Sequence, residues 1–288
     1  MPPQVSVIIP HYNDLENLAR CLALLDRQTL PRDRYEIVVA DNNSRCGLDA
    51  VRACAGSLAR VVPAPEQGAG AARNAAVAAS QGEILAFIDS DCSPAADWLE
   101  RGLSALKLGD MVGGAVSVFC ADPSAPNPVE AFEMVFAFHT RDYVERQHFA
   151  VTANLFASRA IFDRVGGFRA IVAEDMDWCF RAQALGYTLI YGEDVKVAHP
   201  ARDNWSELVR KWRRTTRETY SLSAERRFGR AKWLARALIV LVSPLPHLAQ
   251  VWRTPKIAGW SSRMGASKIL FRLRFFRFVE SVRLLRNG

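Results

Sequence analysis

The chain has 288 residues, half of them hydrophobic, which is enough for a substantial core and excludes a mainly disordered protein. Its net charge of +7 is unevenly distributed: residues 1–200 contain 17 Lys and Arg against 25 Asp and Glu, whereas residues 201–288 contain 20 against 5. We therefore expect an acidic body and a basic C-terminal region that favours an anionic surface. The six cysteines form no C-x-x-C pair, and no basic stretch precedes the first hydrophobic run. These features exclude a zinc ribbon, argue against a signal peptide and favour the reducing cytoplasm.

Strand-like and helix-like segments alternate over the first ninety residues. Runs rich in β-branched and other apolar residues predict strands at 5–9, 35–40, 61–62 and 83–88. Helical periodicity or propensity predicts helices at 14–28, about 48–59 and 71–80. This alternation predicts an α/β fold with a parallel sheet covered on both sides, in which ligands bind beyond the carboxyl ends of the strands.

The pattern becomes looser after Trp98. A proline-rich loop is expected at 121–128, and a helix follows at about 129–148. Residues 152–199 then predict a strand, a helix, a Gly166-Gly167 turn, a helix at about 174–185 and a strand near 187–191.

Polar residues follow three of the predicted strands, at residues 10–13, 41–44 and 89–91. Asp, Asn and Ser favour turns and helix caps, so any one cluster has a purely structural explanation. Three clusters at successive strand ends instead favour a ligand site. Asp89 and Asp91 are the strongest pair, because alternate residues of an extended segment share a face and two adjacent carboxylates repel unless a cation lies between them. A divalent ion bound by these two carboxylates and by substrate phosphates would remove the repulsion between them.

Two further segments are candidates for chemistry. Residues 66–74 form a glycine-containing loop that runs into a helix, where backbone N–H groups and Arg73 favour an anion. The loop matches neither a Walker loop nor a G-x-G-x-x-G fingerprint, and a flexible turn is the alternative. Glu174, Asp175 and Asp177 open a predicted helix, which is typical of helix capping but also places a candidate general base at a pocket edge.

Together these motifs resemble the family 2 glycosyltransferases, which have the GT-A fold. The resemblance covers roughly residues 4–215 and depends on seven short motifs in the family's order: VIIPHYN (7–13), DNNS (41–44), GAGAARN (68–74), DSD (89–91), TAN (152–154), GGF (166–168) and ED (174–175), the last with Arg181 and Gly186. It implies a Rossmann-like, mostly parallel sheet and an inverting transfer from a nucleotide-diphosphate sugar to an acceptor hydroxyl, without a covalent sugar–enzyme intermediate.

The resemblance also implies roles for individual residues. Asp41 would read the nucleotide base, Asp175 would be the catalytic base, and Asp91, Asp89 and His199 would hold Mg²⁺ or Mn²⁺. The full donor-binding set would be Pro10, Tyr12, Asn13, Asp41, Arg73, Asn74, Asp89, Ser90 and Asp91. The residues expected near the acceptor are Asn154, Glu174, Arg213 and Arg214. Without the resemblance, His199 would be read as a structural histidine.

Two departures from the family's pattern matter. Many relatives have D-D-G-S where this chain has Asp41-Asn42-Asn43-Ser44, so contacts to the donor sugar are expected to differ. Processive members carry Q-x-x-R-W, and the nearest segment here, residues 210–214, does not match. Transfer of a single sugar is therefore favoured over polymerisation.

The C-terminal region predicts contact with a membrane. Residues 237–252 lack Asp, Glu, Lys and Arg, but as a helix they would be ~24 Å long, short of a ~30 Å hydrocarbon core, and two prolines interrupt them. Residues 268–286 form a helix-like segment with two apolar faces: Phe271, Phe275, Phe278, Val282 and Leu285 on one, and Ile269, Leu273, Phe276 and Leu284 on the other. We expect one apolar face to pack on protein and the other to contact lipid, with the arginine side chains reaching the phosphates of the lipid headgroups.

We therefore predict a catalytic domain at 1–215 and a basic helical region at 216–288. The protein would act at the cytoplasmic face of the plasma membrane, held there through residues 233–288, on a lipid-linked saccharide in bacterial polysaccharide assembly. It would not bind nucleic acid. The alternatives are a soluble transferase acting on a protein or small molecule, and a non-catalytic nucleotide-sugar scaffold.

Overall fold

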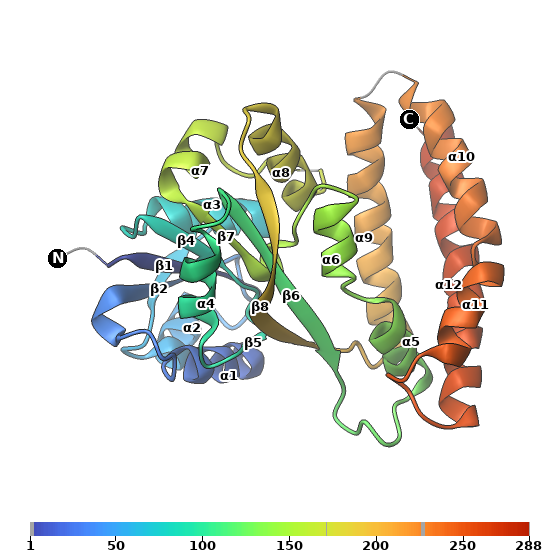
Figure 1. Ribbon diagram of the computed structural model, residues 1–288, viewed down its shortest axis with the longest axis horizontal. Helices are drawn as coiled ribbons and strands as arrows, with labels where there is room; N and C mark the ends of the chain where they lie inside the picture. The colour runs from blue at the N-terminus through green and yellow to red at the C-terminus, as the bar shows by residue number, and fades with distance from the viewer. Residues whose placement is uncertain (1–2, 171, 226–227, 288) are drawn as a thin grey trace. The chain divides into compact units, whose positions relative to one another are not determined.

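The computed structural model describes residues 3–170, 172–225 and 228–287 (Figure 1). The chain forms two compact units. The first contains residues 1–117, 139–170 and 174–199, and the second contains residues 118–138, 171–173 and 200–288. The compact units thus divide the chain near residue 200, whereas the expected domain boundary is at residue 215.

An eight-stranded sheet organises the first unit, in the order β3-β2-β1-β4-β7-β6-β8-β5. The strands are β1 (Val5–His11), β2 (Tyr35–Asp41), β3 (Arg60–Pro63), β4 (Ile84–Phe87), β5 (Ser93–Pro94), β6 (Met111–Phe119), β7 (Leu155–Ser158) and β8 (Leu189–Pro200). β3, β2, β1 and β4 pair in parallel, as the alternating sequence pattern predicts. β7 pairs antiparallel with both β4 and β6, and β5 pairs antiparallel with β8. The sheet is therefore mixed, and the prediction of a mostly parallel sheet is corrected.

Strand β6, which belongs to the antiparallel part of the sheet, is absent from the predicted strands. Its centre contains Gly113 and Gly114, which weaken the strand signal in the sequence. The glycines allow close packing: a Cβ on Gly114 would lie 2.2 Å from the Asn154 amide nitrogen, and one on Gly113 would lie 2.6 Å from the Ala150 Cβ. A strand that depends on tertiary contacts of this kind is hard to recognise from hydrophobic periodicity alone.

Flanking helices cover the sheet, and their sequences explain where they begin. The helices of the first unit are α1 (Leu15–Leu25), α2 (Leu48–Ala55), α3 (Ala69–Ala78), α4 (Trp98–Ala105), α6 (Thr140–Glu145), α7 (Arg159–Val165) and α8 (Glu174–Ala184). Asp14 caps α1 by accepting a hydrogen bond from the Asn17 N–H at 3.2 Å. Small residues on α3, with Ala72 and Ala76 fully buried, let this helix pack against β1, β2 and β3.

The second unit is helical. It contains α5 (Pro128–Phe136), α9 (Trp205–Ala224), α10 (Gly229–Val242), α11 (Pro244–Arg253) and α12 (Trp260–Asn287). The single helix expected at 129–148 is wrong, because α5 ends at Phe136 and α6 begins at Thr140. Phe138 between them has a left-handed backbone conformation (φ +55°), which a continuous α-helix cannot contain.

The long helix α12 forms the centre of this unit and contacts α5, α9, α10 and α11. Ile269, Leu270 and Leu273 are buried in its core, whereas Phe271 and Phe275 are exposed. One apolar face of this helix therefore packs on protein and the other is solvent-facing, as the periodicity predicts. No single described helix is both long and apolar enough to cross a membrane; only α10 and α11 taken together are, and they are bent by 46°.

A buried charge cluster holds α5 to α9 and to the chain that leads into it. Glu133, 2% exposed, pairs with Arg202 Nη1 at 2.8 Å and Lys211 Nζ at 3.0 Å. Burial opposes the charge of Glu133, but Lys211 and Arg202 overcome it and lower the pKa of Glu133 to about 2. Burial and the neighbouring Arg202 lower the pKa of Lys211 to about 8, which outweighs the opposite effect of Glu133.

Candidate active site

The parallel register places the ends of β1 and β2 side by side, with His11 opposite Asp41. His11 Nδ1 lies 3.0 Å from Asp41 Oδ1, and both side chains are almost fully buried. The Asp14 N–H donates to His11 Nε2 at 3.2 Å, which leaves the hydrogen on Nδ1, directed toward Asp41. The Ser44 N–H donates to the other carboxylate oxygen at 3.2 Å. Asp41, the predicted reader of the base, is therefore held by two neighbours.

The side chain of Asn42, which follows β2, forms hydrogen bonds to the glycine loop at residues 66–74 and to the chain just before it. Its amide nitrogen donates to the carbonyls of Ala64, at 2.9 Å, and Glu66, at 2.6 Å, and its oxygen accepts from the Gly68 N–H at 2.8 Å. Gly68 has φ +126°, a backbone conformation that glycine adopts without a Cβ penalty. An aspartate at position 42 would have no N–H to donate, so this departure from the family's D-D-G-S pattern has a direct structural consequence.

Arg73 on α3 joins two of the candidate acidic residues. Its side chain is 4% exposed; Nη2 lies 2.6 Å from Asp89 Oδ1, and Nη1 lies 3.0 Å from Glu174 Oε1. Burial alone would lower the pKa of Arg73, but the charges of Asp89 and Glu174 raise it above its ordinary value. The guanidinium thus bridges the end of β4 and the first residue of α8.

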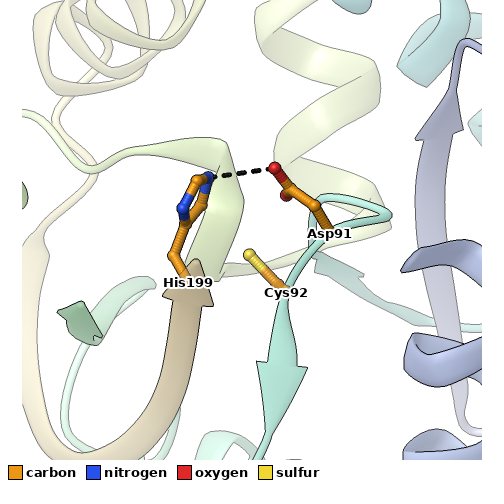
Figure 2. A group of neighbouring side chains, drawn as sticks. All are labelled: Asp91, Cys92 and His199. Carbon is orange, nitrogen blue, oxygen red and sulfur yellow. Dashed lines mark ion pairs between the residues drawn. The ribbon is translucent and has the colours of Figure 1, made fainter. Parts of the chain in front are cut away.

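Asp91 and His199 meet after β4 and near the end of β8 (Figure 2). His199 Nε2 lies 3.2 Å from Asp91 Oδ2, with the side chains 6% and 30% exposed. Cys92 is the third member of a group whose ligand atoms all lie within 4.8 Å of one another. Burial, and then the charges of Asp89 and Asp91, raise the pKa of Cys92 well above its ordinary value. Cys92 is therefore a neutral thiol, and the charged part of the group is a carboxylate beside an imidazole.

This donor set fits a divalent cation such as Mn²⁺ or Mg²⁺. One carboxylate and one imidazole from the protein leave the other coordination positions to water and to substrate phosphates, an arrangement that suits an ion bound together with its nucleotide. Arg20 Nη2 donates to the Asp91 carbonyl at 3.2 Å and helps to fix the backbone at this point.

Asp175 lies in the first turn of α8, next to Glu174. Its Oδ1 accepts from the Met176 N–H at 2.8 Å, and its charge contributes to the raised pKa of Arg73. Asp177 instead faces inward, where Arg181 Nε lies 2.9 Å and Arg169 Nη1 lies 3.5 Å from its carboxylate oxygens. The three acidic residues that open the helix therefore differ in their surroundings, and Asp177 serves the packing of the unit.

Two predicted ligand-binding asparagines direct their amide groups into the protein. Asn74 donates to the Phe168 carbonyl and accepts from the Phe168 N–H, both at 2.9 Å, and so fixes the Gly166–Phe168 turn. Asn154 is fully buried and donates to the carbonyls of Ala115 and Val195, while its oxygen accepts from the indole of Trp98. Both N–H groups of Asn154 are thereby used within the protein.

The remaining predicted residues have varied surroundings. Tyr12 is 53% exposed beyond β1, and the Asn13 side chain accepts from the Arg45 N–H at 2.7 Å. Pro10 is the sixth residue of β1, and Ser90 separates the two aspartates. Arg213 and Arg214 belong to α9 of the second unit, where they lie 3.6 Å from Glu280 and 3.9 Å from Glu218, so a part for them near the acceptor stays a prediction.

Sequence reasoning omitted His11, Ser44, Arg20 and Cys92 from the candidate site. His11 was the most accessible of these to prediction, because it stands between Pro10 and Tyr12 at the end of a predicted strand. Cys92 directly follows Asp91 in the sequence, so its place beside the predicted pair was also open to prediction. Arg20 gave no such signal, since its contact with the Asp91 carbonyl depends on how α1 packs.

Comparison with known proteins identifies the family. Residues 6–171 match the family model "Glycosyl transferase family 2". The chain is 35% identical over 252 residues to the glycosyltransferase AglE of Haloferax volcanii, covering 85% of this chain and 82% of that protein. It is 34% identical over 93 residues to the poly(ribitol-phosphate) beta-glucosyltransferase of Bacillus spizizenii, but this match covers only 31% and 15% of the two chains.

Solved structures give the fold. The mannosyltransferase PcManGT of Pyrobaculum calidifontis, in complex with GDP-Man and Mn²⁺, aligns over 98% of this chain and 86% of its own, with a TM-score of 0.64 and 21% identity. Residues 1–349 of S. aureus TarS, in complex with UDP-GlcNAc, align over 75% and 66%, with a TM-score of 0.53 and 18% identity. The fold is that of the GT-A glycosyltransferases. The protein belongs to glycosyltransferase family 2.

Proposed function

We propose that the protein transfers one sugar from a nucleoside-diphosphate sugar to an acceptor hydroxyl with inversion at the anomeric carbon. The observation that carries the proposal is the 3.2 Å approach of Asp91 to His199 beyond the carboxyl end of β4, beside Asp89 and its partner Arg73. A carboxylate and an imidazole in this position suit a divalent cation bound with a diphosphate. The Mn²⁺ and GDP-Man in the PcManGT structure support the same reading.

Asp91 and His199 would hold the cation, which when bound acts as a Lewis acid toward the diphosphate. In the transfer, the bond between the anomeric carbon and the diphosphate oxygen breaks, and its electron pair remains on that oxygen. The acceptor oxygen forms the new bond from the opposite face, and its proton passes to a carboxylate. Asp175 is the residue proposed for that proton, because the Arg73–Glu174 pair holds the start of its helix beside Asp89.

Asp41 is the residue proposed to contact the nucleotide base. The His11 ring and the Ser44 N–H fix its carboxylate in a single orientation, and a preorganised acceptor discriminates between bases better than a mobile one. The loop tied down by Asn42 leads into α3, where backbone N–H groups favour a phosphate.

The acceptor proposed is a lipid-linked saccharide in polysaccharide assembly at the cytoplasmic face of a membrane. The basic charge of residues 201–288 supports this choice, and the six cysteines are all free thiols, as in a reducing compartment. A soluble acceptor is the rival, and transfer to water-soluble saccharides as efficient as transfer to a lipid-linked one would favour it.

The donor proposal is tested by calorimetric titration of the whole chain with UDP, GDP and dTDP, each with and without Mn²⁺. We expect at least one nucleoside diphosphate to bind, and Mn²⁺ to tighten its binding. The matched control is Asp49→Asn, which changes an exposed carboxylate that pairs with Arg52 on the same helix. Failure of all three nucleotides to bind, with and without metal, would contradict the proposal.

A further inference from the structure

Exposed apolar side chains are concentrated in the second unit. Among the described residues, eleven of the fourteen exposed large hydrophobic side chains lie between Phe228 and Val279. Five of them lie on α10 and at the start of α11, and we call them the docking face: Leu234, Leu238, Ile239, Val242 and Leu245, 46–69% exposed. Leu234, Leu238 and Val242 recur at four-residue intervals and so share one face of α10, and an exposed apolar face of this kind indicates a site of interaction.

The opposite face of the same two helices is already occupied by protein. Gly229, Trp233, Ala237, Pro244 and Val251 are buried on this side of α10 and α11. The Trp233 indole donates to the Ser281 carbonyl of α12 at 3.2 Å. Packing inside the unit therefore accounts for one face of the helix pair and leaves the docking face without a role in the described fold.

The charges near the docking face identify its partner. Residues 229–253 contain four basic residues and no acidic one. Arg230, Lys232 and Arg236 lie in the first two turns of α10, and Arg253 ends α11, so positive charge lies at both ends of an apolar middle. All three basic residues on α10 are exposed. Arg230 also donates to the Leu285 carbonyl of α12 at 2.7 Å, and the Arg236 guanidinium lies over the Trp233 ring, whereas Lys232 has no such contact among those of the described residues. A surface that is apolar in the centre and positive at its ends matches the acyl boundary and anionic headgroups of a lipid bilayer.

We propose that the docking face inserts into the headgroup–acyl boundary of an anionic bilayer, with α10 and α11 lying along the membrane plane. The buried face of the pair argues against a spanning arrangement, because it is tied to α12. That helix contains seven Lys and Arg in 28 residues, and crossing the bilayer would bring many of them into hydrocarbon. The 46° bend at the Val242–Pro244 break suits a surface-bound pair.

This surface goes beyond the transferase activity, and its test needs no substrate. Vesicle flotation measures binding of the whole chain to phosphatidylcholine vesicles with or without phosphatidylglycerol. We expect binding only when the anionic lipid is present, with partial release at high salt, because salt screens the basic residues but not the inserted leucines. Equal binding to both vesicle types, or none, would overturn the proposal.

The docking face itself is tested by Leu238→Ser/Leu245→Ser. Its matched control is Leu108→Ser/Leu185→Ser, which changes two leucines of similar exposure in the first unit. The docking-face variant should lose roughly tenfold in vesicle partitioning, since each inserted leucine contributes transfer free energy, whereas the control should bind as the parent does. Thermal unfolding at the parent's temperature confirms that both variants fold.

Two results would contradict this assignment. Equal loss of vesicle binding in both double variants would mean that general surface hydrophobicity, and not the docking face, governs attachment. If Leu238→Ser/Leu245→Ser instead dissociates an oligomer in light scattering and leaves vesicle binding unchanged, the face is an interface between two copies of the chain.

Discussion

Arg73 and Asp89 form an ion pair with 2.6 Å between Nη2 and Oδ1, and the other terminal nitrogen of the same guanidinium contacts Glu174. One buried cation thereby links the strand that leads to the proposed metal site with the helix that carries the proposed base. The bridge sets the distance between these two elements, because a planar guanidinium presents its donors in a fixed fork.

Replacing Arg73 with methionine should destabilise the protein and impair transfer. The change leaves Asp89 and Glu174 close together without a cation, and breaking a buried pair typically costs about 3–5 kcal/mol. Because both carboxylates are partly exposed, we expect about 2–3 kcal/mol in the free energy of unfolding, measured by urea denaturation. Arg52→Met, at an exposed pair, should cost less than about 1 kcal/mol. Equal costs for the two variants would contradict the bridging role.

Asn42→Asp should weaken donor binding through the glycine loop. The aspartate keeps the acceptor for the Gly68 N–H but loses the donors to Ala64 and Glu66, and unmade hydrogen bonds of this kind cost about 1–3 kcal/mol each. We expect a higher KM for the donor. Asn43→Asp is the control, because this exposed neighbour donates to the Pro65 carbonyl and not to the residues that Asn42 contacts. An unchanged KM in Asn42→Asp would show that the loop does not touch the donor.

Asp175→Asn separates binding from chemistry. The amide keeps the shape of the side chain but cannot accept the proton, so turnover should fall by about 10²–10⁴-fold while donor affinity stays the same. Steady-state kinetics and donor titration measure the two effects. Loss of donor affinity with unchanged turnover of the bound complex would assign Asp175 to the nucleotide site.

The buried Glu133 should make the protein sensitive to acid. Its pKa is about 2 in the folded protein and about 4.5 when unfolded, so its contribution is complete above pH 4.5 and is lost as pH falls toward 2. This shift corresponds to a loss on the order of 3 kcal/mol. In Glu133→Gln the free energy of unfolding should fall at neutral pH and depend less on pH between 4.5 and 2, whereas the exposed Glu145→Gln should behave as the parent. Parallel acid-unfolding curves for parent and Glu133→Gln would refute the assignment.

The four strands of the first ninety residues could be predicted because each contains a short apolar run, and polar residues follow three of these runs. β6 could not be predicted in this way, because its two glycines weaken the strand signal. The reason for them, the close approach of Asn154 and Ala150, appears only in the folded structure. The break between α5 and α6 was also missed. The apolar periodicity of the sequence continues through Phe138, but the backbone of Phe138 is left-handed and ends the helix.

The same contrast holds for the candidate site. Asp89 and Asp91 were predicted as a pair from their spacing after a buried strand. His199 was expected beside them only through the family resemblance, and it lies 3.2 Å from Asp91. The His11–Asp41 contact depends on strand register, and the inward-facing amides of Asn74 and Asn154 depend on tertiary packing, so local sequence carries little information about either.

The central claim, metal-assisted use of a nucleoside-diphosphate sugar at Asp91 and His199, is tested most directly by measuring nucleoside diphosphate release from the preferred donor. The parent should release it in the presence of Mn²⁺ and lose this activity in chelator, with recovery when Mn²⁺ is returned. Asp91→Asn should lose most of the Mn²⁺-dependent rate, by about 10²-fold or more, while Asp49→Asn keeps it. Full activity of the parent in chelator, or of Asp91→Asn with Mn²⁺, would contradict the account.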